Sequence, residues 1–328
     1  MNIFAENKKS KTLIKFKTQF EMKKVLVATD KPFAKEAVDG IQAKAKAAGY
    51  EVVLLEKYGT KDKLLAAVAD VDAMIIRSDV ADKEVIEAGK NLKIIVRAGA
   101  GFDNIDLNAA TACNVVAMNT PGQNSNAVAE LAIGLMIMAA RNNYNGKSGS
   151  EIHGKKLGIY GYGNVGRLLG KYAMGFGMEV VAYDPFLTKE QIESTGAKQC
   201  TNLDDLFGTC HYISLHCPAN DETKKSINMS KIGKMPKGAT LINTARKEVI
   251  DEDDLKKVLA ERPDFKYMAD VAPECAAELK ENYADRVFFT PKKLGAQTEE
   301  ANVNAGIAAI NQIVDYFENG NERFRLNK

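Results

Sequence analysis

The segment K-L-G-I-Y-G-Y-G-N-V-G-R-L-L-G, residues 156–170, decides how this chain should fold. An apolar run typical of a strand leads into Gly161, Gly163 and Gly166, spaced as G-x-G-x-x-G, and the residues that follow suit a helix. Gly161 allows a tight turn, Gly163 lets the backbone approach a pyrophosphate, and Gly166 lets the helix pack closely on the strand. Because the first N–H groups of a helix lack partners, they suit phosphate oxygens. The segment therefore predicts a strand–turn–helix unit that binds a dinucleotide.

Asp184 strengthens this interpretation, because it ends the next expected strand, 23 residues after Gly161. A carboxylate at that place accepts hydrogen bonds from both ribose hydroxyls and repels the 2′-phosphate of NADP. We therefore expect NAD as the cofactor. The alternative is an ordinary glycine turn beside a solvated aspartate, which does not account for the strand, the glycines and the carboxylate together.

Outside this segment, short apolar runs alternate with amphipathic stretches. The runs predict strands at 25–29, 50–55, 73–77, 93–97, 115–118, 156–160, 179–183, 212–216, 239–243 and 267–271. Apolar residues at helical spacing predict helices at 33–48, 60–70, 82–90 and 107–113. Strands interleaved with helices form parallel sheets covered on both faces. Because 328 residues exceed one ordinary core, we predict an α/β fold with two doubly wound parallel-sheet domains.

Two further helices are expected, at 126–141 and at 299–317. The first is hydrophobic nearly all round, so it should be buried, either inside the chain or at a dimer contact. The second follows the last expected strand and the segment discussed below as catalytic.

The composition excludes several classes of protein. A hydrophobic share of 45% and a charged share of 27% are typical of a globular protein in water. The net charge of +2 comes from 45 basic and 43 acidic residues, which argues against a nucleic-acid partner. No apolar stretch approaches the roughly 20 residues that cross a bilayer, so we expect no membrane partner.

Cysteine and histidine usage points to a cytoplasmic protein without a metal site. The five cysteines form no C-x-x-C pair, and the three histidines form no ligand cluster. Residues 1–21 are lysine-rich and contain no apolar run of a secretory signal. We expect them to be a disordered extension, with a transit peptide as the alternative.

Several motifs occur together in one order along the chain. They are R-S-D-V (77–80), R-A-G-A-G-F-D-N-I-D (97–106), N-S-N-A-V-A-E-L (124–131), H-C-P (216–218), N-T-A-R (243–246) and L-G-A-Q-T (294–298). With the glycine motif, the chain resembles the D-isomer-specific 2-hydroxyacid dehydrogenase family, most closely its short D-3-phosphoglycerate dehydrogenases. The resemblance implies a Rossmann NAD-binding domain, 122–298, inserted in a flavodoxin-like substrate-binding domain, 22–121 plus 299–328.

Arg246 resembles the catalytic arginine of the family. A planar guanidinium holds a carboxylate by two hydrogen bonds while it polarises the neighbouring C2 oxygen. The proton-transfer group departs from the family, because T-P-K-K-L-G-A (290–296) replaces the usual T-P-H segment. Aligned on the residues before the last helix, Lys293 takes the place of the histidine; aligned on Thr290 and Pro291, Lys292 does. We favour Lys293, and the alternative is that both lysines are solvated and His216 transfers the proton.

A lysine suits this chemistry in both directions. As an ammonium it donates a proton to a 2-keto acid, and for the oxidation it must first be neutral, which its usual pKa of about 10.4 opposes. Burial and positive neighbours should lower that pKa. The carboxylate partner expected from the family is Glu274, although D-V-A-P-E-C places it one residue early. Glu278 is the alternative partner.

The resemblance assigns further positions. On the cofactor side these are Asn164, Val165, Cys217, Pro218, Thr223, Thr244, Ala245, Asp270 and Gly295, with Asp270 near the nicotinamide amide. On the substrate side they are Ala98 and Gly99, as backbone donors to the carboxylate, and Arg77, Ser78 and Asn124, at the substrate phosphate. The alternative for Arg77 is that it ends a strand and pairs with an acid.

The function implied is NAD-dependent oxidation of D-3-phosphoglycerate to 3-phosphohydroxypyruvate, in serine biosynthesis. The alternatives are a reductase of hydroxypyruvate, glyoxylate or another 2-keto acid, and a non-catalytic NAD-sensing protein similar to corepressors. The expected partners are a small phosphorylated 2-hydroxy acid and a second copy of the chain in a homodimer. Because long relatives carry a serine-binding domain after the last helix, and this sequence ends at Lys328, we expect no feedback by serine.

Overall fold

Five parallel strands form the first sheet of the computed structural model, which describes residues 22–328. The expected extension at 1–21 lies outside the described residues. The strand order is β2-β1-β3-β4-β5, with β1 and β3 side by side where the order reverses. The strands are β1 (Lys24–Thr29), β2 (Glu51–Glu56), β3 (Ala73–Ile76), β4 (Ile94–Arg97) and β5 (Val116–Asn119). All five strands predicted for this part are confirmed.

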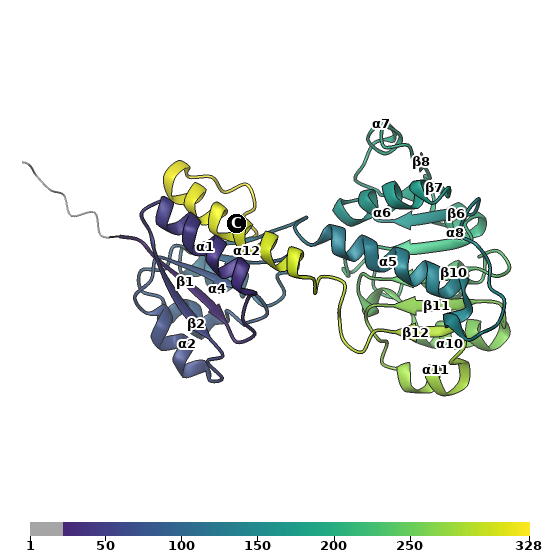
Figure 1. Ribbon diagram of the computed structural model, residues 1–328, viewed down its shortest axis with the longest axis horizontal. Helices are drawn as coiled ribbons and strands as arrows, with labels where there is room; N and C mark the ends of the chain where they lie inside the picture. Colours follow the sequence, from purple (N-terminus) through teal and green to yellow (C-terminus); the bar gives the residue numbers. More distant parts are fainter. Residues whose placement is uncertain (1–21) are drawn as a thin grey trace, which may run out of the picture.

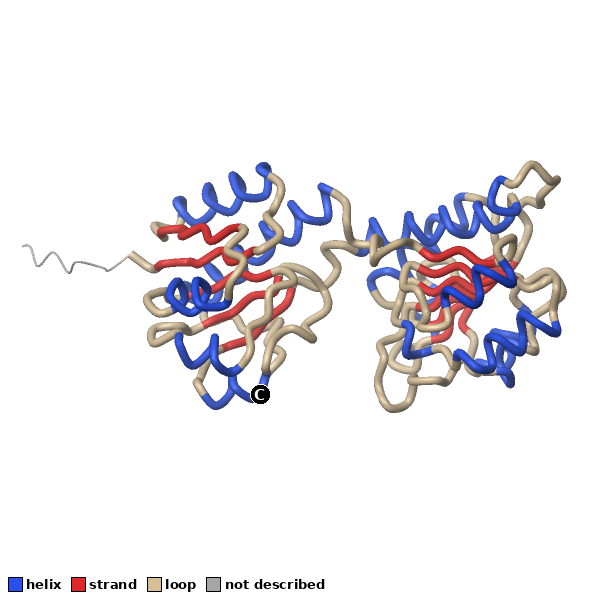
Figure 2. The backbone as a smooth tube through the Cα atoms, turned by 90° about the horizontal axis from the view of Figure 1, so that it is seen from below, coloured by secondary structure: helices blue, strands red, loops and turns tan. Residues whose placement is uncertain are grey.

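Helices cover both faces of this sheet (Figure 2). They are α1 (Lys35–Ala47), α2 (Lys61–Val68), α3 (Lys83–Ala88), α4 (Leu107–Ala112) and the last helix of the chain, α12 (Glu299–Asn319). Side chains of α1 and α12 pack on one face, and those of α2, α3 and α4 pack on the other. Strands such as β3, all of whose residues are buried, read as continuous apolar runs because both faces are covered.

The second sheet has seven parallel strands in the order β12-β11-β10-β9-β6-β7-β8. Its order reverses between β6 and β9, which is where ligands bind in open α/β sheets. The strands are β6 (Lys156–Tyr160), β7 (Glu179–Tyr183), β8 (Lys198–Gln199), β9 (Tyr212–Leu215), β10 (Thr240–Asn243), β11 (Lys266–Ala269) and β12 (Val287–Phe289). The edge strands β8 and β12 were not predicted, because two or three residues carry no periodicity.

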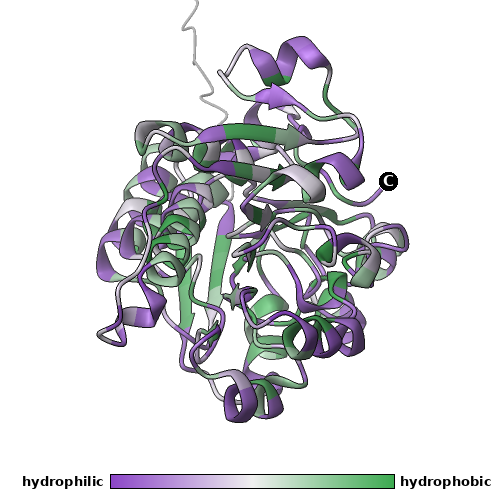
Figure 3. Ribbon diagram, turned by 90° about the vertical axis from the view of Figure 1, so that its right-hand side faces the viewer, coloured by the Kyte–Doolittle hydropathy of each residue, from purple (hydrophilic) through white to green (hydrophobic). Residues whose placement is uncertain are grey.

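The helices of the second sheet lie on both of its faces (Figure 1). They are α5 (Ser125–Ala140), α6 (Asn164–Gly175), α7 (Lys189–Glu193), α8 (Leu203–Thr209), α9 (Met229–Ile232), α10 (Glu252–Glu261) and α11 (Ala276–Tyr283). The apolar helix α5 packs against α6 and against β10 and β11. Hydrophobic residues concentrate on the strands, with hydrophilic ones on the outer helix surfaces (Figure 3). In the described residues, 22–328, no helix has the length and apolar character of a bilayer span.

The chain crosses between the two sheets twice. It leaves the first sheet after β5 and returns through α12, which lies beside α1 although some 250 residues separate them in sequence (Figure 1). A Cβ at Gly40 of α1 would lie 3.1 Å from Ile307 of α12, so these helices are in close contact. On this packing we propose 22–121 plus 299–328 as the substrate-binding domain and 122–298 as the NAD-binding domain.

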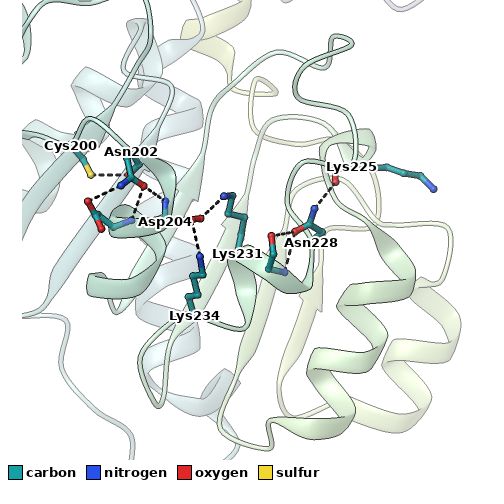
Figure 4. Close-up of polar contacts among 9 residues, drawn as sticks. Cys200, Asn202, Asp204, Lys225, Asn228, Lys231 and Lys234 are labelled. Carbon is teal, nitrogen blue, oxygen red and sulfur yellow. Dashed lines mark hydrogen bonds and ion pairs between the residues drawn. The ribbon is translucent and has the colours of Figure 1, made fainter.

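Ion pairs and caps fix the smaller helices of the second sheet. Asn202 caps α8 and Asn228 caps α9 by accepting backbone N–H groups. Asp204 on α8 pairs with Lys231 of α9 and, at 2.7 Å, with Lys234, and so joins the two helices (Figure 4). These lysines lower the pKa of Asp204 to about 2.

Candidate active site

The glycine loop after β6 has the geometry that the sequence predicts. Gly161 has a φ of +90°, and a Cβ there would lie 2.8 Å from the carbonyl carbon of His216. A Cβ at Gly166 would overlap the carbonyl oxygen of Gly161. At Gly163, by contrast, nothing lies within 4 Å of an added Cβ. The loop is therefore tightly packed at Gly161 and Gly166, and there is open space beside Gly163.

Donors and one acceptor face this opening. No residue in 22–328 accepts the backbone N–H groups of Asn164, Val165 and Gly166, in the first turn of α6. Asp184, directly after β7, accepts the N–H of Tyr162 at 2.8 Å and that of Phe186 at 2.9 Å. Unpaired amides suit a pyrophosphate, and the oriented carboxylate suits ribose hydroxyls. These residues fit a dinucleotide.

His216 follows β9 and is bonded at both ring nitrogens. Nε2 lies 2.9 Å from Ser214 Oγ, and Nδ1 lies 3.3 Å from Thr244 Oγ1. Burial lowers the pKa of His216 to about 3, so the ring is neutral near pH 7. A neutral ring between two hydroxyl groups is a poor proton donor, which weakens the alternative that His216 transfers the proton.

The loop after His216 is shaped by its own hydrogen bonds. The Thr223 hydroxyl donates to the Pro218 carbonyl and accepts the N–H of Asn220 at 2.9 Å. Cys217 is buried, and burial raises the pKa of its thiol to about 12. In the next loop Ala245 is also buried, and its N–H donates to Asn243 Oδ1 at 3.0 Å. Cys217 lies beside the glycine loop, because a Cβ on Gly161 would be 2.9 Å from its backbone nitrogen.

Arg246 faces the other domain. Its Nη2 lies 3.7 Å from Asp103 Oδ2, and its Nη1 donates to the Ala245 carbonyl at 3.0 Å. A Cβ at Gly101 would lie 3.3 Å from the same Nη2. The guanidinium that follows β10 therefore reaches the 101–103 segment after β4, across the boundary between the two sheets.

Lys293 is the amine that enters this charged group. Its surroundings lower its pKa from the usual 10.5: burial contributes most, and the positive charges of Arg246 and Arg97 add to the effect. Asp270 and Asp103 oppose the shift. The residue as a whole keeps exposed surface, so water still screens part of these interactions. Lys292, its neighbour, is also exposed.

Asp270, directly after β11, holds the segment that carries Lys293. Its buried carboxylate accepts the N–H of Leu294 at 2.7 Å, the N–H of Gly295 at 2.9 Å and the Thr290 hydroxyl at 3.0 Å. In this structure the hydrogen bonds of Asp270 are thus made to the 290–295 segment. The expected contacts of Asp270 and Gly295 with a nicotinamide stay predictions.

The expected carboxylate partner of the lysine lies elsewhere. Glu274 has 78% of its side chain exposed and pairs with Lys247. Glu278 lies 3.8 Å from Lys256. The structure therefore brings neither glutamate to Lys293; Asp270 and Asp103 are the carboxylates that act on it. Glu274 stands one residue earlier than the family pattern, and in this structure its side chain pairs with Lys247.

The backbone donors expected at Ala98 and Gly99 are already occupied. The Ala98 N–H donates to the Ile76 carbonyl at 2.8 Å, and the Gly99 N–H donates to the Thr120 hydroxyl at 2.6 Å. The N–H groups of the next two residues, Ala100 and Gly101, meet no acceptor in 22–328. They lie in the segment that faces Arg246. The structure thus leaves free the N–H groups of Ala100 and Gly101 and not those of Ala98 and Gly99, and the donors to the substrate carboxylate stay a prediction.

Comparison with known proteins places the chain in a family. Residues 109–292 match the NAD binding domain of the D-isomer specific 2-hydroxyacid dehydrogenases. Hydroxypyruvate reductase of Thermotoga maritima is 35% identical over 310 residues, covering 89% of this chain and 98% of that protein. The chain belongs to the D-isomer specific 2-hydroxyacid dehydrogenase family. The domain that matches is the NAD binding domain of these dehydrogenases.

Two phosphoglycerate dehydrogenases of this family are also similar. The NAD⁺-bound 3-phosphoglycerate dehydrogenase of Entamoeba histolytica is 46% identical, with a TM-score of 0.85 over 94% of this chain and 99% of that one. D-3-phosphoglycerate dehydrogenase of Methanocaldococcus jannaschii is 37% identical over 77% of this chain. The chain spans about half the length of that protein, 51% of it.

The residues expected at a substrate phosphate are only partly available. Arg77, after β3, donates to the carbonyls of Lys31 and Pro32 at 3.2 and 3.0 Å and to Asn302 of α12. These contacts of its guanidinium involve no acid, while its backbone N–H donates to Asp79 at 3.4 Å. Ser78 is exposed and lines a cavity of about 380 Å³. Asn124 precedes α5 without capping it.

Sequence reasoning missed two residues of this dehydrogenase's cleft. Arg97, the last residue of β4, is paired in register with Ile76 and donates from Nε to the Arg77 carbonyl at 3.0 Å. Asp103 follows in the same motif. A charged residue at the carboxyl end of a buried parallel strand was the available signal, because such strand ends meet at one edge of the sheet.

Proposed function

We propose that this chain is an NAD-dependent D-3-phosphoglycerate dehydrogenase that produces 3-phosphohydroxypyruvate. The observation that carries the proposal is the position of Lys293, whose pKa is lowered beside Arg246 and Arg97. Arg246 follows β10 and Lys293 follows β12, in the sheet that holds the glycine loop, and Arg97 ends β4 of the other sheet. The similarity to two phosphoglycerate dehydrogenases supports D-3-phosphoglycerate as the substrate.

Bound NAD supplies the hydride acceptor for this oxidation. The N–H groups of Asn164 and Val165 suit its pyrophosphate, and Asp184 suits the ribose. Arg246 binds the substrate carboxylate and polarises the C2 oxygen, with the free N–H groups of Ala100 and Gly101 as further donors. Lys293, neutral at the start of the oxidation, accepts the C2 hydroxyl proton. In the reverse direction its ammonium returns that proton to the keto oxygen.

A lowered pKa suits this exchange. A lysine at its usual pKa near 10.4 is almost entirely protonated at neutral pH and accepts no proton. Burial and two nearby guanidinium groups destabilise the ammonium, so that more of the amine is neutral. The same charges attract an anionic substrate. One cationic group thus serves both substrate binding and proton transfer.

The second candidate is a reductase of hydroxypyruvate, glyoxylate or a similar keto acid. The Thermotoga relative matched over nearly its whole length is a hydroxypyruvate reductase, and the guanidinium of Arg77 is already engaged within its own domain. The test is a panel of D-3-phosphoglycerate, D-glycerate and glycolate with NAD and with NADP. Preference for the phosphorylated acid with NAD supports our proposal; equal or better turnover of D-glycerate favours the reductase.

Arg77→Ala and Asn124→Ala sharpen this comparison. If these residues bind the substrate phosphate, each variant raises the KM for 3-phosphoglycerate and leaves that for D-glycerate unchanged. The third candidate, a non-catalytic NAD sensor, predicts tight NADH binding and a flat absorbance trace with 3-phosphohydroxypyruvate.

We also propose that the enzyme acts in the cytoplasm as a homodimer. A second cavity, of about 230 Å³, lies at the end of α5, and Ile137, Ala140 and the 47% exposed Phe176 line it. Tyr144, close by in the chain, is 67% exposed. Large apolar side chains grouped in this way are typical of subunit contacts. Sedimentation of the purified protein and of Phe176→Glu tests the dimer, which the variant should weaken.

A further inference from the structure

Asp103 is the acidic side chain that approaches the catalytic arginine. The two residues come from different sheets: Asp103 follows β4, and Arg246 follows β10. Their Oδ2 and Nη2 atoms are 3.7 Å apart, with 86% of the Asp103 side chain and 36% of the Arg246 side chain exposed. An exposed carboxylate at that distance makes a weak ion pair that a better anion displaces at little cost.

The place that Asp103 occupies has the features of an anion subsite. A Cβ on Gly101 would lie 3.3 Å from Arg246 Nη2 and 3.7 Å from Asp103 Oδ2, so both groups meet above this glycine. The N–H groups of Ala100 and Gly101 have no acceptor among residues 22–328. A guanidinium next to a segment with two free amides offers the kinds of donor that a carboxylate requires.

Of the two carboxylates near Arg246 and Lys293, Asp103 is the one whose side chain can move away. Arg97, Arg246 and Lys293 are cationic neighbours. The other carboxylate that acts on Lys293, Asp270, is buried and bonded to the 290–295 segment. The side chain of Asp103 is not held in this way. Within residues 22–328, its contact with Arg246 is its only polar contact.

We propose that Asp103 is an internal counter-ion of Arg246, which the carboxylate of the substrate displaces on binding. The inference rests on the proposed function and adds a residue that sets substrate affinity and the rate of product release. Before substrate binds, the carboxylate of Asp103 lies beside the guanidinium, where the carboxylate of the substrate would bind. When product leaves, the same carboxylate competes for the arginine and favours dissociation.

Binding of oxalate tests the displacement without turnover. Oxalate presents the carboxylate that a 2-keto acid presents, and calorimetry measures its affinity for the NADH-loaded enzyme. Asp103→Asn should bind oxalate about two- to fivefold more tightly, the range that loss of an exposed competing ion pair gives. Asp62→Asn, an exposed aspartate on α2, is the matched charge control and should bind as wild type. Asp103→Glu, which keeps the anion, should also stay near wild type.

Weaker binding by Asp103→Asn would overturn the proposal, because it would mean that Asp103 orients Arg246 rather than competing with substrate. Equal binding by the variant, or no binding of oxalate by the wild type, would overturn it as well. If the enzyme turns over no 2-hydroxy acid but Asp103→Asn binds oxalate more tightly, the proposed function is wrong. The inference that Asp103 is the counter-ion of Arg246 is then still supported.

The pH profile supplies a second readout. Asp103 is one of the two carboxylates that raise the pKa of Lys293, against Arg246, Arg97 and burial. Its removal should therefore shift the alkaline rise of the oxidation rate to lower pH and decrease the KM for the hydroxy acid more than it changes kcat. An unshifted profile would contradict the placement of Asp103 beside Lys293.

Discussion

The carboxylate of Asp270 accepts the backbone N–H of Gly295 at 2.9 Å, and this contact fixes the segment that carries Lys293. The N–H of Leu294 binds the same carboxylate at 2.7 Å. A buried side chain at the end of β11 therefore positions an amine two residues before the glycine that it binds. The proton-transfer group is held by its backbone, while its own side chain stays partly exposed.

Gly295→Ala tests this arrangement. The added Cβ would lie 2.8 Å from Asp270 Oδ2, so the segment or the carboxylate must shift. Because small misplacements of catalytic groups cost up to about 10²-fold, we expect kcat to fall about tenfold or more. Gly208→Ala on α8, where an added Cβ meets nothing within 4 Å, is the control and should keep wild-type turnover. Unchanged kcat in Gly295→Ala would show that the contact does not position Lys293.

The two directions of the reaction should respond oppositely to pH. Lys293 has a pKa below its usual 10.5, chiefly through burial and then through Arg246. The oxidation needs the neutral amine, so its rate should rise with pH and level off above the lowered pKa. The reduction needs the ammonium, so its rate should fall over the same range. Initial rates from about pH 7 to about pH 10 test this. Parallel profiles would assign the proton to another group.

Asp184 should determine the choice between NAD and NADP. Asp184→Asn keeps an oxygen for the N–H of Tyr162 but removes the charge that repels a 2′-phosphate. We expect the KM for NAD to rise about tenfold, the loss of one charged hydrogen bond, and the preference over NADP to shrink. Glu193→Gln, an exposed acid on α7 of the same sheet, is the control. A preference for NAD that survives in Asp184→Asn would place the ribose elsewhere.

The ion pairs of Asp204 should contribute to stability in a defined pH window. Lys231 and Lys234 lower the pKa of Asp204 to about 2 in the folded chain, from an ordinary value of 3.8. A depressed pKa stabilises the fold above the ordinary value, and this contribution is lost as pH falls through the lowered one. Asp204→Asn should therefore unfold at lower denaturant concentration than wild type at pH 7, and the difference should close between about pH 4 and about pH 2. A difference that is undiminished at about pH 2 would contradict the assignment.

The sequence predicts the fold well because an apolar run of four or more residues marks the position of each buried strand. Ten strands were placed within one or two residues, including the buried strand 73–77, observed as β3 (Ala73–Ile76). The edge strand β8 has two residues, too few for a pattern in the sequence. It is a strand only because it pairs with β7. Short capped helices such as α9, of four residues, escape prediction for the same reason.

The residues of the candidate site could be predicted from the sequence where their placement depends on the residues next to them in the chain. Gly161 and Gly166 follow from the turn itself, and Arg246 and Lys293 come together because strand ends share an edge. Glu274 pairs with Lys247 and not with Lys293, a contact that no local pattern reveals, and its catalytic role stays a prediction. The N–H groups of Ala98 and Gly99 donate to Ile76 and Thr120, from two other parts of the chain, and these long-range contacts leave no local pattern either.

The most direct test of the account is the pair Lys293→Ala and Lys292→Ala, assayed by NADH absorbance with 3-phosphohydroxypyruvate and by NADH binding. We predict that Lys293→Ala lowers kcat by about 10²- to 10⁴-fold, the usual contribution of general acid–base catalysis, with NADH binding retained, while Lys292→Ala stays near wild type. Full turnover by Lys293→Ala, or loss confined to Lys292→Ala, would contradict the account.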